Sequence, residues 1–119
     1  MRSPFIPLLA LATFLAGCAG SAMDHARSAP PAKTLTSQKP AQRVAECTEF
    51  AWQSDVMFGI DANAYLRKGE AGTFTVYTRE GAYFVDIKPQ GAGASLAFYA
   101  PASAGETRDR RLAALATCL

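Results

Sequence analysis

Side chains that bind metal ions are scarce in this sequence. His25 is the only histidine, and the three cysteines lie far apart at Cys18, Cys47 and Cys118. A structural zinc site takes four cysteine or histidine ligands, and these are usually spaced closely in pairs. The sequence therefore predicts no metal site, and we expect no cofactor.

Catalytic and nucleotide-binding motifs are also missing from the sequence. Gly91 and Gly93 lack the strand-loop-helix context that a phosphate-binding glycine motif requires. No serine has a histidine nearby in the part expected to fold, and the carboxylates lack the spacing of a paired acid and base. We therefore predict that the protein is not an enzyme. The alternative is a small enzyme whose carboxylates are brought together only by the fold, from among Asp61, Glu70, Asp86 and Glu106.

The chain has little net charge and no apolar run long enough to cross a membrane. Its formal charge is +2 at pH 7, whereas proteins that bind nucleic acid normally carry a clear basic excess. Nucleic acid is therefore not an expected partner. The apolar run from Phe5 to Ala16 is shorter than the roughly 20 residues that span a bilayer. It follows Arg2 and ends in small residues, which is typical of an export signal.

The end of this run, Leu15-Ala16-Gly17-Cys18, resembles the lipobox of bacterial lipoproteins. The resemblance implies removal of residues 1–17, acylation of Cys18 and anchoring in a membrane, since several acyl chains hold a protein stably in a bilayer. Ala19 stands where an aspartate would imply retention at the inner membrane, so the expected location is the outer membrane, facing the periplasm. The alternative is an ordinary secretory signal, cut near Gly20-Ser21-Ala22.

After Cys18, the segment up to residue 40 is rich in Ala, Ser, Thr and Pro and has almost no large apolar side chain. Such a composition buries too little surface to offset the entropy lost on ordering. We therefore predict that residues 18–40 form the lipidated cysteine and a flexible tether, with an end-to-end distance of about 25 Å. His25 lies in this segment, where a mobile chain cannot position a catalytic group.

Cys47 and Cys118 are predicted to form a disulfide. They flank the region expected to fold, and an exported protein reaches an oxidising compartment in which disulfides persist. Closing a loop of about 70 residues stabilises a domain by about 4 kcal/mol in the chain-entropy view. A domain this small often needs such a link. The alternative is two buried free cysteines.

Two amphipathic helices and three strands are predicted for residues 41–119. Apolar residues at helical spacing indicate one helix from Ala41 to about Ser54 and another from about Glu106 to the end; the residues are Val44, Cys47, Phe50 and Ala51 in the first and Leu112, Leu115 and Leu119 in the second. Trp52 is expected to pack in the core or at its rim. Residues rich in β-branched and aromatic types predict strands over 73–79, 82–88 and 95–100, and a short strand over 56–60 is a weaker expectation.

The strand register follows from the apolar pattern. A two-residue hairpin at Glu80-Gly81 places Val76 opposite Val85, and a six-residue loop over 89–94 places Val85 opposite Phe98. We therefore expect an α+β fold: a three- to four-stranded antiparallel meander with the N- and C-terminal helices on its apolar face, joined by the disulfide. The other face could remain in contact with water.

The same register places three aromatic residues, Tyr77, Phe84 and Tyr99, in a row across that other face. Three such rings could form a platform for a partner. They could instead be covered by residues 56–66, or simply stabilise the sheet through cross-strand contacts. We predict a membrane-anchored interaction or structural module that docks an envelope protein through its sheet. The alternative is binding of peptidoglycan or another saccharide through the aromatic row.

Overall fold

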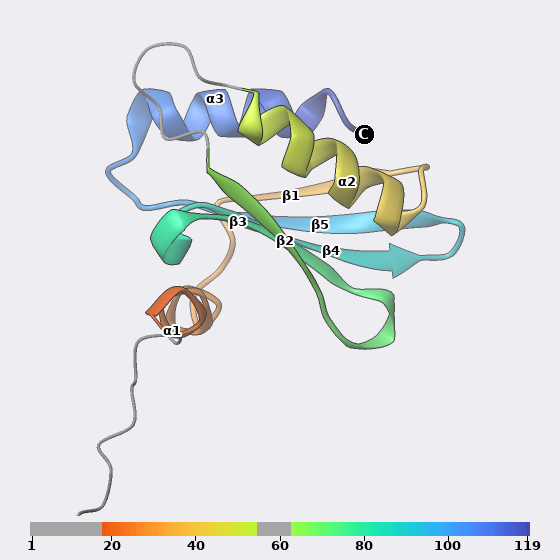
Figure 1. Cartoon of the computed structure of the whole chain (residues 1–119), viewed down its shortest axis with the longest axis horizontal. Coiled ribbons are helices and arrows are strands. Elements are labelled where there is room, and N and C mark those ends of the chain that lie inside the picture. Colours follow the sequence, from red (N-terminus) through yellow and green to blue (C-terminus); the bar gives the residue numbers. More distant parts are fainter. Residues whose placement is uncertain (1–17, 55–62) are drawn as a thin grey trace, which may run out of the picture.

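The computed structural model describes residues 18–54 and 63–119, which form an α+β domain (Figure 1). The export signal expected at residues 1–17 and the strand expected at 56–60 lie outside these residues. In chain order, the elements are α1 (Cys18–Ala26), β1 (Lys33–Ser37), α2 (Ala41–Gln53), β2 (Ala64–Lys68), the 3-10 turn η2 (Glu70–Gly72), β3 (Phe74–Thr78), the 3-10 turn η3 (Arg79–Gly81), β4 (Phe84–Gln90), β5 (Gly93–Tyr99) and α3 (Gly105–Ala116).

The described strands form one antiparallel sheet of five strands in the order β1-β5-β4-β3-β2. Strands β2 to β5 follow one another as a meander, and β1 is added at the edge beside β5. The chain then crosses from one edge of the sheet to the other through α2 (Figure 1). The α+β class is therefore confirmed, with more strands than the three or four expected.

The predicted register is confirmed, although the loops differ from those expected. Val76 lies opposite Val85, and Val85 lies opposite Phe98. Pairing of β4 with β5 continues to Gln90 and Gly93, so the loop between them has two residues instead of six. Pro89 lies within this pairing, opposite Ala94 and close to the two-residue turn. Between β3 and β4, the 3-10 turn η3 replaces the tight two-residue turn.

Helices α2 and α3 cover one face of the sheet, and the core lies between them and the strands (Figure 1). The core consists of apolar side chains from both layers: Ala41, Val44, Ala45, Trp52, Ala64, Phe74, Val76, Val85, Ile87, Ala94, Leu96, Phe98 and Leu115. Phe50 was expected in the apolar stripe of the first helix, but 71% of it is exposed. The buried stripe of α2 runs instead through Val44, Thr48 and Trp52, which recur every four residues and therefore share one side of the helix.

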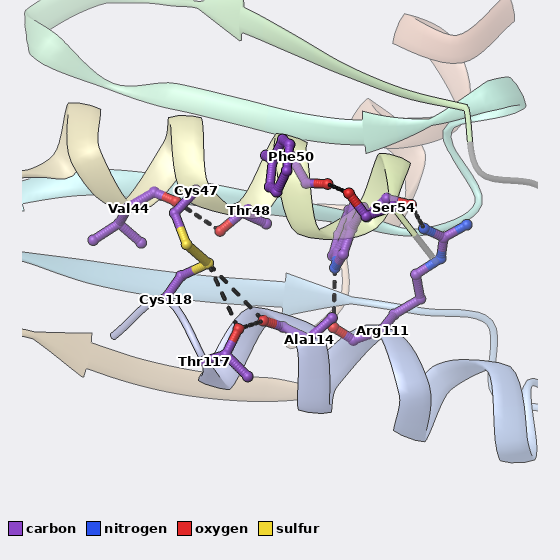
Figure 2. The surroundings of a disulfide bond; sticks show 10 residues. Val44, Cys47, Thr48, Phe50, Ser54, Arg111, Ala114, Thr117 and Cys118 are labelled. Atoms are coloured by element: carbon purple, nitrogen blue, oxygen red, sulfur yellow. Dashed lines mark hydrogen bonds between the residues drawn. A yellow bond between two sulfur atoms is a disulfide. The ribbon is translucent and has the colours of Figure 1, made fainter. Parts of the chain in front are cut away.

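The disulfide between Cys47 and Cys118 is confirmed, and it joins the middle of α2 to the chain just after the end of α3 (Figure 2). A second link joins the end of α2, at Trp52, to the middle of α3, at Arg111. The Trp52 indole N–H donates to the carbonyl oxygen of Arg111 at 3.0 Å, and the Arg111 guanidinium donates to the carbonyl oxygen of Trp52 at 3.2 Å. Trp52 also packs edge-on against Phe98 of β5, so it connects both helices to the sheet.

The expectation of a flexible tether over residues 18–40 is wrong. This segment contains α1 and β1, and β1 pairs with β5 along its whole length. In β1, Leu35 lies opposite Leu96 and packs against the core, while Thr34 and Thr36 point to the other face. The backbone hydrogen bonds of an edge strand and one well-placed leucine thus provide the stabilisation that composition alone did not indicate.

Candidate functional site

Aromatic side chains lie in a row across the sheet face opposite α2 and α3. Tyr77 lies opposite Phe84 and Phe84 lies opposite Tyr99, as the register predicts. The row also includes Tyr65, which pairs with Tyr77 from β2. Sequence reasoning missed Tyr65 because the pattern around β2 did not distinguish a strand from a helical turn.

The row is not an open platform, because α1 covers its centre. Phe84 is 0% exposed, and Met23 of α1 is 1% exposed. The guanidinium carbon of Arg27, just after α1, lies 4.9 Å from the centre of the Phe84 ring. The sequence also suggests residues 56–66 as a cover for the row, and most of these lie outside the described residues. Among the described residues, the cover comes from the segment next to Cys18.

A charged pair fastens the end of α1 to the sheet. The Arg27 guanidinium donates two hydrogen bonds to the Asp86 carboxylate of β4, each 2.8 Å long. The Thr75 hydroxyl of β3 donates to the same carboxylate at 2.7 Å. This two-pronged geometry is the strongest form of arginine–carboxylate contact. We call Arg27, Asp86 and Thr75 the latch.

The surroundings of Asp86 favour its ionised form. Desolvation of the carboxylate by itself raises its pKa, and it is the largest single influence. The hydrogen bonds from Arg27 and Thr75, with the positive charges of Arg27 and Lys88, together outweigh it and hold the pKa of Asp86 below its usual value. The latch is therefore a fully charged contact at neutral pH.

The approach of α1 to η3 depends on a glycine. Gly81 has a φ of +71°, which side chains other than glycine rarely adopt. A β-carbon at this position would lie 2.8 Å from the carbonyl oxygen of Ala19 and 3.0 Å from a side-chain carbon of Met23. Gly81 thus allows both the turn and the close contact with the first turn of α1.

Beside this covered area, strands β1, β5 and β4 leave a shallow groove of about 680 Å³. We call the sheet face opposite α2 and α3 the second face. The polar and small residues that line the groove on this face are Thr34, Thr36, Asp86, Lys88, Gln90, Ser95, Ala97 and Tyr99. We call this set the polar strip. The volume is within the range of small-molecule sites in proteins, and the strip is the part of the second face that remains accessible in this area.

The remaining sequence-predicted sites have different outcomes. Cys18 is the first residue of α1. Among residues 18–54 and 63–119, no cluster of three or more histidine, cysteine or acidic residues could hold a metal ion. Within the same ranges, no helix has both the length and the apolar character needed to cross a bilayer.

Comparisons with known proteins add no relative to this description. No protein-family model matches the chain, and neither a curated protein nor a solved structure is significantly similar to it. The assignment of function therefore depends on the residues and contacts described above.

Proposed function

We propose that the chain is a lipid-anchored envelope protein that holds its sheet close to the membrane and binds an envelope component there. The lipobox resemblance of Leu15-Ala16-Gly17-Cys18 supports the anchor. The observation that carries the proposal is that α1 begins at Cys18 and is fastened to the sheet through Met23 and the latch. An acylated Cys18 would therefore be connected to the domain without a flexible spacer.

The position of the polar strip supports a binding role for the second sheet face. The first face is covered by α2 and α3, and the centre of the aromatic row is covered by α1. The strip on β1, β5 and β4 is accessible while α1 is docked, so an anchored domain can present it. The partner of this module is an envelope protein or a wall saccharide, and the latter is favoured by the single observation that Tyr99 borders the strip.

Mass spectrometry of the intact protein from the membrane fraction tests the anchor. The expected mature chain begins at Cys18 and carries acyl groups on that residue. A chain that begins at any later residue, such as one cut near Ala22, would contradict the proposal. A Cys18→Ser variant should lose the acyl mass. If this variant keeps acyl groups, they are attached to a different residue, which would contradict the proposed anchor.

Photo-crosslinking in the cell tests the binding role. A crosslinking residue at Thr36, which is exposed in the polar strip, should capture a specific adduct. The same residue at Glu70, which is exposed in η2, provides the control. Equal adducts at both positions, or none at Thr36, would contradict binding through the strip.

A further inference from the structure

We propose that the polar strip binds an acidic saccharide of two linked sugar rings, with one ring against Tyr99 and a carboxylate near Lys88. This inference rests on the proposed function only in placing the protein in the envelope, where wall glycans are found. The binding chemistry itself rests on the strip alone.

Tyr99 provides a fixed aromatic surface at one end of the strip. Its ring is stacked on Phe84, with the ring centres 4.6 Å apart and the planes within 8° of parallel. Phe84 is itself 0% exposed and lies under the Arg27 guanidinium. A ring supported in this way loses little conformational freedom when a ligand packs against it, which favours binding. The apolar face of a sugar ring is a suitable partner for such a surface.

The floor of the strip is small and rich in hydroxyl groups. Ala97 lies opposite Thr34 on one side and Asp86 on the other, and Ser95 lies opposite Thr36 and Lys88. Within the described part of the chain, the hydroxyls of Thr34, Thr36 and Ser95 have no side-chain hydrogen-bond partner, so they are available to a ligand. Each hydroxyl both donates and accepts, which matches the hydroxyl groups of a sugar.

The strip has the length and charge for an acidic disaccharide. Ser95 and Tyr99 are four residues apart on β5, a distance of about 13 Å along a strand, which suits two linked sugar rings. The charges of Arg27 and Asp86 neutralise each other through the latch. Lys88 is exposed and makes no direct ion pair among the described residues. Its charge acts on Asp86 at longer range, and its ammonium group is accessible to a ligand carboxylate.

The composition of the strip favours a saccharide over a protein partner. The central part of a protein interface is typically apolar, with aromatic residues and methionine enriched and lysine and serine depleted. The strip instead contains Lys88, Gln90 and Ser95 toward one end and a single aromatic ring, that of Tyr99, at the other. A captured protein is therefore the competing outcome in the experiment below.

Calorimetric titration of the full chain, purified in detergent, tests this inference. The probe is the disaccharide of N-acetylglucosamine and N-acetylmuramic acid, and chitobiose is the uncharged comparison. Lys88→Gln should weaken binding of the acidic disaccharide about two- to fivefold, as expected for an exposed charge pair, and leave chitobiose unchanged. Tyr99→Leu should weaken binding of both about tenfold. The matched control Lys68→Gln changes an exposed lysine on β2 and should change neither.

Several results would overturn the inference. Absence of saturable binding by the acidic disaccharide would refute it, as would equal effects of Lys88→Gln and Lys68→Gln. Equally tight binding of chitobiose would refute the acidic selectivity. If Tyr99→Leu does not fold, Ser95→Val tests the floor of the strip instead. A protein adduct at Thr36 with no disaccharide binding would assign the strip to a protein. A correctly acylated Cys18 together with a specific adduct at Thr36 would show that only this inference has failed.

Discussion

Replacing Asp86 with asparagine should weaken the docking of α1 on the sheet while the rest of the domain stays folded. Asparagine keeps the shape of the side chain but removes the charge that Arg27 contacts twice at 2.8 Å. Hydrogen bonds to a charged group contribute about 1.5–3 kcal/mol net. The side chains of Arg27 and Asp86 are 25% and 13% exposed. Solvent therefore screens the attraction between them only in part. Because solvent still reaches both groups, the larger cost of breaking a deeply buried ion pair does not apply.

The expected effect is local because α1 lies outside the main core. The core lies between the sheet and helices α2 and α3, and α1 contacts the opposite face. A loss of 1.5–3 kcal/mol in docking therefore corresponds to about 10- to 150-fold faster amide hydrogen exchange in α1. Exchange in β4 and β5, measured by mass spectrometry on the same sample, should change much less.

Two comparisons make this prediction specific. Asp109→Asn removes an exposed carboxylate that contacts Arg108 at 3.4 Å on α3, and it should leave exchange in α1 unchanged. In a double-mutant cycle, Arg27→Gln and Asp86→Asn together should cost less than the sum of the single changes. Unchanged exchange of α1 in Asp86→Asn, or an equal increase across the whole domain, would refute the idea of a separate latch.

Three further predictions follow from the same contacts. The pKa of Asp86 is lowered in the folded state, so the latch should contribute fully above the unfolded value of about 3.9 and be lost as the pH falls through the folded value. Protection of the α1 amides, taken relative to their intrinsic exchange rate at each pH, should therefore fall at low pH, and unchanged protection would contradict this. Gly81→Ala should destabilise the turn by about 1–2 kcal/mol and displace Ala19; an unchanged urea midpoint together with protected α1 amides would argue against it. Replacing both Cys47 and Cys118 with serine should lower the free energy of unfolding by about 4 kcal/mol, measured by urea denaturation, and a loss below 1 kcal/mol would show that packing of α2 on α3 is sufficient.

Residue patterns predicted the centre of the fold because local and long-range preferences agree there. The strands β3, β4 and β5 alternate apolar and polar residues, so a shift of one residue would expose every core side chain. This constraint fixed the pairs Val76–Val85 and Val85–Phe98 and thereby the row of Tyr77, Phe84 and Tyr99. The disulfide was predicted from the expected export signal and from the number of cysteines left after Cys18.

The N-terminal part could not be predicted from composition. Its helix buries one large apolar side chain, Met23, and its strand buries part of Leu35. No periodic pattern arises from so few residues. The latch is also invisible in the sequence, because Arg27 and Asp86 are 59 residues apart and nothing local indicates that they meet. Sequence reasoning therefore identified the aromatic row but not its cover.

The cover decides which part of the second face is available to a partner. Undocking α1 would remove the latch contacts and expose Met23, whose burial contributes about 1.5–3 kcal/mol. With the latch, these contacts favour the docked form by at most about 3–6 kcal/mol, before subtraction of the chain entropy that α1 would regain on undocking. A partner that needed the open row of Tyr77, Phe84 and Tyr99 would have to supply this energy itself. A ligand of the polar strip meets its site already formed. We therefore expect this domain to engage its partner first at the strip, which includes Tyr99, and not at the covered centre of the row at Phe84.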